Sequence, residues 1–114
     1  MINLLEETLK TLSSNGKTPE DVIWFGDHYY KTTWDGFASI ANFTYDNGYG
    51  GNEIEDSLYI VGDNWWLERG EYDGSEWWEF KTVPKCDSEK FTKLISVETN
   101  WRDGLTWEKE DESN

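Results

Sequence analysis

The sequence has very few of the residues that build metal sites and nucleophilic active sites. Among its 114 residues there is one cysteine, Cys86, and one histidine, His28. A single cysteine excludes a disulfide within the chain, and a reducing compartment is the simplest setting for it. Structural zinc sites usually take four cysteine or histidine ligands. We therefore expect no metal and no cofactor, and a Cys–His catalytic pair fits poorly because the two residues lie far apart in the sequence.

Long apolar runs and basic residues are also scarce. No segment approaches the ~20 apolar residues of a membrane-spanning helix, and the first residues lack the basic region of a signal peptide. The sequence therefore predicts a cytoplasmic protein. Lysine and arginine number 10 against 24 aspartate and glutamate, a formal net charge of −14. Such a surface repels nucleic acid and anionic membrane and attracts basic surfaces, so we expect neither of the first two as a direct partner.

Motifs of the common enzyme classes are missing as well. The sequence has no phosphate-binding loop, no dinucleotide-binding fingerprint and no Gly-x-Ser-x-Gly elbow. Paired carboxylates are plentiful, but a glycosidase needs a deep cleft and this chain is short for one. A calcium loop at 46–56 departs from the EF-hand pattern, because Gly48 stands where a ligand is needed. We expect a protein that acts by binding and is not an enzyme.

Aromatic side chains are abundant, and their pattern predicts the fold. Aromatics make up 17% of residues and include eight tryptophans, enough for an aromatic core. The expected elements are a helix over 2–14, a hairpin over 22–33, a helix over 34–43, a loop over 44–52, a strand at 58–61, a hairpin of 65–72 and 76–82, and a short helix from 87 or 88 through 95. This order predicts an α+β fold, an antiparallel sheet of about five strands with two or three helices on one face. We expect a single domain over 1–107 and an acidic tail over 108–114.

The second hairpin has the strongest local signal, because Asp73-Gly74 is typical of a two-residue β-turn. The expected cross-strand pairs are Leu67–Phe80, Arg69–Trp78, Trp65–Thr82, Gly70–Trp77 and the mildly repulsive Glu68–Glu79. Since successive strand residues face opposite sides, Trp65 and Trp78 should point into the core and Trp66 and Trp77 outward. Outward tryptophans can anchor a protein interface or stack on sugars. Alternatively, a C-terminal segment carrying Trp101 and Trp107 covers them.

The negative charge is concentrated in the middle of the chain. Residues 35–80 carry one basic and 11 acidic groups, net −10, whereas 1–34 and 81–114 each carry net −2. Solubility needs only a net charge of about 2–8, so carboxylates spaced on a rigid sheet suggest an imitation of phosphate rows; the alternative is an ordinary solvated acidic face. The residues expected to bind the partner are Tyr49, Glu53, Glu55, Asp56, Asp63, Trp66, Glu68, Glu71, Asp73, Glu76, Trp77 and Glu79.

Three segments, YDNGYGG at 45–51, IVGDNWWLER at 60–69 and EYDGSEWWEF at 71–80, resemble a group of small uncharacterised proteins encoded by phages and prophages of Gram-positive bacteria. The resemblance covers about residues 20–84 and implies a phage accessory protein in the host bacterial cytoplasm. Proteins of this kind include inhibitors of host defence, such as anti-CRISPR proteins and DNA mimics. The expected function is therefore an inhibitor that occupies a basic, nucleic-acid-binding cleft of a bacterial protein, with a Cas nuclease as the most specific version. The alternatives are a Trp-based module for carbohydrate or peptide, and a structural or replication-associated phage protein.

Overall fold

The structure is a computed structural model that describes residues 1–48, 51–97 and 106–107, the last two by their backbone alone. The chain divides into two units, Met1–Val83 and Pro84–Asn114, which are described separately. The predicted extension of the first domain to residue 107 stays a prediction, and the predicted tail at 108–114 lies outside the described residues.

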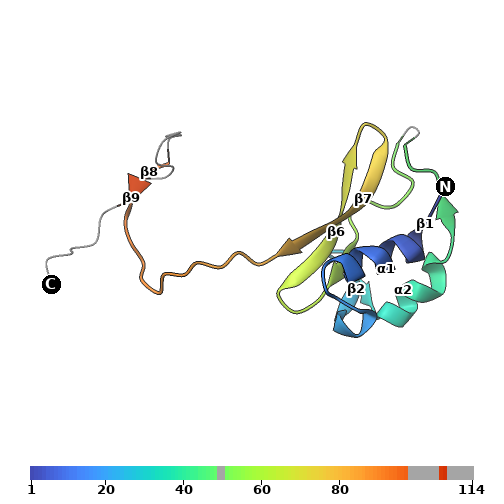
Figure 1. Ribbon diagram of the computed structural model, residues 1–114, viewed down its shortest axis with the longest axis horizontal. Coiled ribbons are helices and arrows are strands. Elements are labelled where there is room, and N and C mark those ends of the chain that lie inside the picture. Colours follow the sequence, from blue (N-terminus) through green and yellow to red (C-terminus); the bar gives the residue numbers. More distant parts are fainter. Residues whose placement is uncertain (49–50, 98–105, 108–114) are drawn as a thin grey trace, which may run out of the picture. The chain divides into compact units, whose positions relative to one another are not determined.

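The first unit is an α+β fold, as predicted. Its elements are β1 (Ile2–Asn3), α1 (Leu4–Ser14), the 3₁₀ turn η1 (Pro19–Asp21), β2 (Trp24–Gly26), β3 (Lys31–Thr32), α2 (Trp34–Ala41), β4 (Thr44–Tyr45), β5 (Tyr59–Val61), β6 (Trp65–Tyr72) and β7 (Ser75–Thr82) (Figure 1). The main sheet has five strands in the order β3-β2-β5-β6-β7, and every neighbouring pair is antiparallel. The predicted five-stranded antiparallel sheet is confirmed.

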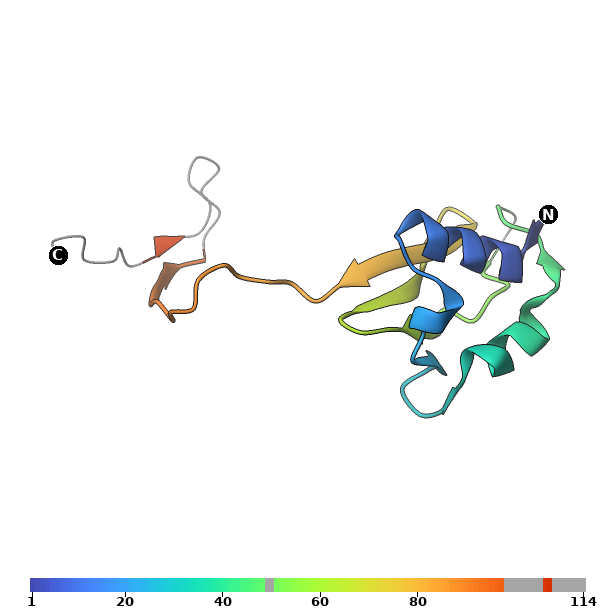
Figure 2. The ribbon, with the colours of Figure 1, turned by 60° about the horizontal axis from the view of Figure 1, so that its bottom comes forward.

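The hairpin of β6 and β7 has the predicted register at every position. Leu67 pairs with Phe80 and Gly70 with Trp77. Asp73 and Gly74 both have positive φ, 52° and 84°, as a type I′ turn requires. The tip of the hairpin lies beside the segment that follows β4 (Figures 1 and 2), where the Gly48 N–H donates to the Gly74 carbonyl at 2.9 Å.

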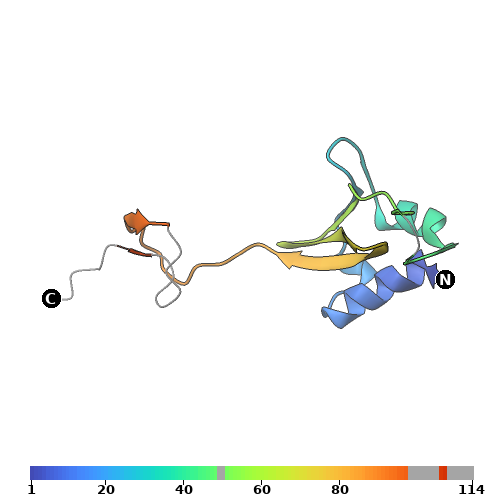
Figure 3. The ribbon, with the colours of Figure 1, turned by 90° about the horizontal axis from the view of Figure 1, so that it is seen from above.

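One face of the sheet, the inner face, carries the core. Phe25, Ile60 and Leu67 lie side by side on neighbouring strands and are all buried. The α2 side chain Phe37 packs on Phe25 with ring centroids 4.5 Å apart. Helix α1 runs along the β6–β7 hairpin (Figure 3), and its Thr8 hydroxyl accepts a hydrogen bond from the Trp78 indole N–H at 2.8 Å. Both helices therefore contact side chains of the inner face.

The ends of the two helices follow from their caps. The first helix begins at Leu4 and not at residue 2, because the Asn3 side chain accepts from the Glu6 N–H and caps it. The second is capped as predicted by Thr33, whose hydroxyl accepts from the Gly36 N–H at 3.2 Å. Neither α-helix in the described residues is long and apolar enough to cross a membrane.

Two local predictions are wrong. The segment at 44–52 is not entirely a loop, because β4 finds a partner in β1 at the start of the chain, with Ile2 opposite Tyr45. In the second unit there is no helix over 87–95. The Ser88 hydroxyl bonds both the N–H and the carbonyl of Lys90, a local turn and not a helix cap. Strand β8 (Leu94–Ser96) then pairs with β9 (Thr106–Trp107).

Candidate functional site

The face of the sheet opposite the core, here called the outer face, carries a group of aromatic and charged side chains. Its side chains fall into cross-strand rows over β2, β5 and β6. Trp24, Val61 and Trp66 form one row, and Gly26, Tyr59 and Glu68 form the next. Because side chains alternate along a strand, these residues share the outer face. The helix contacts described above, Phe37 with Phe25 and Thr8 with Trp78, are made on the inner face.

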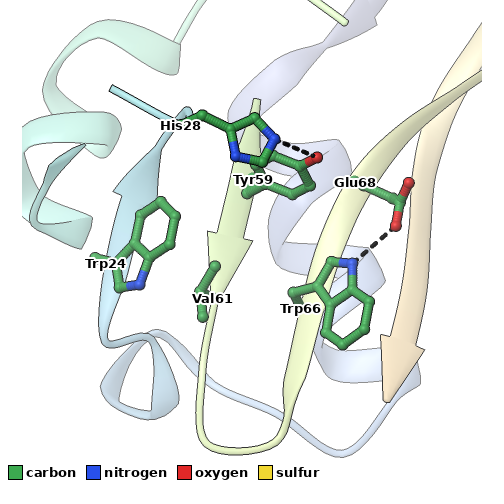
Figure 4. Close-up of a pocket in the computed structure, with 6 residues that line it drawn as sticks. All are labelled: Trp24, His28, Tyr59, Val61, Trp66 and Glu68. Atoms are coloured by element: carbon green, nitrogen blue, oxygen red, sulfur yellow. Dashed lines mark hydrogen bonds between the residues drawn. The ribbon is translucent and has the colours of Figure 1, made fainter. Parts of the chain in front are cut away.

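The two rows surround an open hollow of about 370 Å³. It is lined by Trp24, His28, Tyr59, Val61, Trp66 and Glu68. In Figure 4 the two indoles stand on either side of the small Val61, while Tyr59 and His28 close one end and the Glu68 carboxylate lies beside Trp66. The hollow is thus an aromatic slot with a single carboxylate at its rim.

Hydrogen bonds between the lining residues hold the slot in shape. The Trp66 indole N–H donates to Oε1 of Glu68 at 2.8 Å. The Tyr59 hydroxyl lies 3.2 Å from Nε2 of His28, and the two rings meet edge-on with centroids 5.2 Å apart. Among the described residues, no hydrogen bond or ion pair engages Oε2 of Glu68. One carboxylate oxygen therefore remains available to a ligand.

The predicted like-charge pair, Glu68 opposite Glu79, is present. Each carboxylate accepts from the tryptophan two residues earlier on its own strand, since the Trp77 indole N–H donates to Oε1 of Glu79 at 3.3 Å. Oε2 of Glu79 also pairs with the Lys81 ammonium at 3.3 Å. These contacts compensate the repulsion that two facing carboxylates produce.

The loop between β2 and β3, which carries His28 of the slot, also carries two exposed tyrosines. Oδ1 of Asp27 accepts from the N–H groups of Tyr29 and Tyr30, both at 2.8 Å, and these two bonds lower the pKa of Asp27. The tyrosine side chains are 86% and 83% exposed. A hydrogen-bonded turn therefore holds two exposed aromatic residues in the same loop as His28, which lines the hollow.

Glu76, expected at the binding surface, is instead buried with 1% of its area exposed. Its carboxylate pairs with the Arg69 guanidinium at 3.0 Å and accepts from the backbone N–H groups of Glu53 and Ile54. Like Trp78, two residues later, it points to the inner face. The prediction is wrong because strand alternation sends Glu76 inward, where it closes the loop before β5 onto the sheet.

The Arg69 guanidinium joins a wider buried network. It contacts the Tyr45 hydroxyl at 3.2 Å and Glu7 at 3.4 Å, and its carbon lies 4.7 Å from the Trp78 ring centre. The Tyr45 hydroxyl donates to Glu7 at 2.8 Å, and burial raises the pKa of Tyr45 to about 12. This network is structural and leaves no accessible charge of Arg69 to oppose the acidic surface.

The other predicted acidic residues do not gather on one side of the sheet. Asp63 and Asp73 lie in the turns at opposite ends of β6, a strand of eight residues that spans about 25 Å at ~3.3 Å per residue. Glu71 is exposed near the hairpin tip. A continuous row of carboxylates, as phosphate imitation requires, is therefore absent from the described part of the chain.

The loop before β5 holds the remaining acidic candidates, Glu53, Glu55 and Asp56, all exposed. Glu53 accepts from the Asp46 N–H at 3.1 Å, so it stabilises its own loop. The hydroxyl and N–H of Ser57 hold the pKa of Glu55 below its ordinary value of 4.5. Tyr49 lies outside the described residues. Of the predicted set, the structure brings together Trp66, Glu68, Trp77 and Glu79 on the outer face.

Sequence reasoning missed four members of the slot, Trp24, His28, Tyr59 and Val61. For three of them the signal was the alternation in the segments 22–26 and 58–61, which turns Trp24, Tyr59 and Val61 outward once Phe25 and Ile60 are placed inward. His28 lies in the loop after β2, where alternation gives no signal. The outward residues of these two segments lie side by side because β2 pairs with β5. These strands are separated in the chain by β3, α2 and β4, and no local sequence pattern predicts that they pair.

Among the described residues no group of three or more His, Cys, Asp or Glu side chains is placed to hold a metal ion. Comparisons of the chain with protein-family models, with curated proteins and with solved structures find no match.

Proposed function

We propose that this protein acts by binding and that the outer face of its sheet docks on a cationic surface of a partner protein. The observation that supports this function is the arrangement of half-buried indoles beside carboxylates, Trp66 with Glu68 and Trp77 with Glu79. Tryptophans are frequent anchors of interfaces, and arginine side chains bind carboxylates through charge-assisted hydrogen bonds. The indole–carboxylate pairs of this face therefore match basic side chains of a partner, and the two lysines of the same face, Lys31 and Lys81, lie outside the slot.

The charge around the outer face favours the same kind of partner. Residues 1–83 carry 16 acidic and 5 basic groups, net −11, and one of the basic groups, Arg69, is buried. Scattered exposed carboxylates accelerate the approach of a cationic partner over several ångströms without touching it. We assign this steering role to the acidic residues of the loops and turns, and the contact role to Glu68 and Glu79.

The most common large basic surfaces of proteins are those that bind nucleic acid. We therefore propose as the target a nucleic-acid-binding surface of a bacterial protein, and an inhibitory role for this chain. This proposal agrees with the setting that the resemblance to phage proteins implies, in which a Cas nuclease is the most specific candidate.

Affinity capture from a bacterial lysate at low salt, followed by a salt gradient, tests the proposal. The double variant E68Q/E79Q removes the two glutamate charges that β6 and β7 place on the outer face. The matched control E6Q/E20Q removes two exposed charges from α1 and η1. We expect a nucleic-acid-binding protein to be retained by the native chain and by the control, lost from E68Q/E79Q, and released by duplex DNA or RNA. Equal retention by both variants, or no competition by nucleic acid, contradicts the proposal.

A second candidate function, carbohydrate or neutral-peptide binding, is supported by the aromatic slot itself, since indoles stack on sugar rings. It predicts changes in tryptophan fluorescence with neutral oligosaccharides and little dependence on salt. Capture that is insensitive to both salt and E68Q/E79Q would favour this function over the first.

A further inference from the structure

The slot on the outer face has a geometry that selects the chemistry of the group it receives. Trp24 and Trp66 stand two strands apart with Val61 between them, which separates their backbones by about 10 Å at ~4.8 Å per strand. A planar group stacked between two rings needs about 7 Å, from two contacts of ~3.5 Å. The slot therefore has room for one flat or slender group above Val61.

The polar groups of the slot are mostly committed to one another. The Tyr59 hydroxyl and the His28 ring are in contact, and the Trp66 N–H is held by Oε1 of Glu68. A sugar needs several directed donors and acceptors, and few remain. The strongest remaining polar group is the carboxylate of Glu68, and no lysine or arginine is among the lining residues. The slot therefore offers a ligand one negatively charged group, the Glu68 carboxylate, beside the faces of aromatic rings.

From this charge complementarity we infer that the slot receives the side chain of an arginine on the partner protein, a specification that rests on the proposed function. The guanidinium is planar, stacks on indoles and pairs with carboxylates through two parallel hydrogen bonds. Its methylene stem suits the apolar surface of Val61. In the bound state the guanidinium lies against Trp24 and Trp66 and donates to Glu68.

Nuclear magnetic resonance of the full ¹⁵N-labelled chain tests the inference directly, because the indole N–H signals of Trp24 and Trp66 report on the slot. Their assignment uses the variants Trp24→Phe and Trp66→Phe. The probes are the peptide acetyl-Gly-Arg-Gly-amide, its citrulline analogue, which has the same shape without the charge, and a neutral glucose oligomer. We expect the arginine peptide to shift both indole signals and to bind at least about fivefold more tightly than the citrulline peptide.

Matched variants separate the slot from the general negative field. Glu68→Gln should weaken the arginine peptide at least about fivefold, whereas Glu6→Gln, exposed on α1 and outside the slot, should change its affinity less than about twofold because exposed charges interact weakly. An unchanged spectrum away from the slot shows that Glu68→Gln is folded. Equal binding of the citrulline peptide, indifference to Glu68→Gln, or indole shifts with the glucose oligomer alone would overturn the inference, as would the absence of any shift.

The outcome is separable from that of the proposed function. If the lysate protein is captured through Glu68 and Glu79 but the arginine peptide leaves both indoles unmoved, the arginine assignment fails and the proposed docking face stands. If the peptide binds the slot but no nucleic-acid-binding protein is captured, the slot assignment stands and the proposed target fails.

Discussion

Removal of the buried Glu76 carboxylate is the sharpest test of how this fold is held together. In Glu76→Ala, the Arg69 guanidinium loses its partner at 3.0 Å, and the N–H groups of Glu53 and Ile54 lose an acceptor. Breaking a buried ion pair from one side costs about 3–5 kcal/mol, and a buried donor left unpaired costs about 1–3 kcal/mol. Because Arg69 keeps Glu7 at 3.4 Å as a second, longer partner, we expect a total of about 4 kcal/mol.

The measurement is urea unfolding followed by circular dichroism and by tryptophan fluorescence. A loss of this size is a large share of the ~5–15 kcal/mol that stabilises a typical domain. The matched control is Glu79→Ala, on the same strand but partly exposed and facing outward, which should cost less than about 1 kcal/mol. Glu76→Gln, which keeps the shape and one acceptor oxygen, should fall between the two.

A double variant separates the two roles of Glu76. If the cost arose only from an unpaired charge, Arg69→Met combined with Glu76→Ala would restore most of the stability. Since the carboxylate also binds two backbone N–H groups, we expect only partial recovery. A Glu76→Ala cost below about 1 kcal/mol, or full recovery in the double variant, would refute this account of the loop closure.

Three further predictions concern the core. Burial raises the pKa of Tyr45 from the ordinary 10.0 to about 12, so between these two pH values only the unfolded chain loses the proton. The free energy of unfolding should therefore fall by up to about 1.4 kcal/mol per pH unit in this range, and less in Tyr45→Phe, which urea unfolding at pH 9–12 measures. Gly62→Ala places a methyl group within the indole of Trp65 and should cost about 1–3 kcal/mol, visible as a lower thermal midpoint. Thr8→Val removes the acceptor of the Trp78 N–H at 2.8 Å and should cost about 1–3 kcal/mol, whereas Thr8→Ser should cost less.

The parts of the fold that the sequence predicts are those in which local chemistry and alternation agree. Asp73-Gly74 adopts the two positive φ values of its turn, and from this turn the alternation of the hairpin places every cross-strand pair correctly. The Thr33 cap is local in the same sense. In each case the interaction joins residues that are only a few positions apart, so it can be predicted without knowing how the rest of the chain folds.

The parts that could not be predicted depend on contacts between distant segments. The slot exists only because β2 pairs with β5, which sets Trp24 beside Val61. The burial of Glu76 was implied by its parity with Trp78, but its partners come from β6 and from the loop before β5. A glutamate on an otherwise acidic hairpin is normally solvated, so we expected Glu76 to be exposed although strand alternation places it on the inner face. That prediction is wrong.

Because side chains alternate along the hairpin, its carboxylates should differ in how strongly salt weakens their interactions. Glu76 is paired inside the protein, where ions screen little, while Glu68 and Glu79 face outward, where added salt weakens attraction to a partner. Raising the salt concentration should therefore release the captured partner while leaving the stability difference between the native chain and Glu76→Ala nearly constant. If salt erased that difference, the Arg69–Glu76 pair would be accessible to ions and the division of the sheet into a structural and a binding face would be wrong. If salt left capture unchanged, the outer carboxylates would not be the groups that hold the partner.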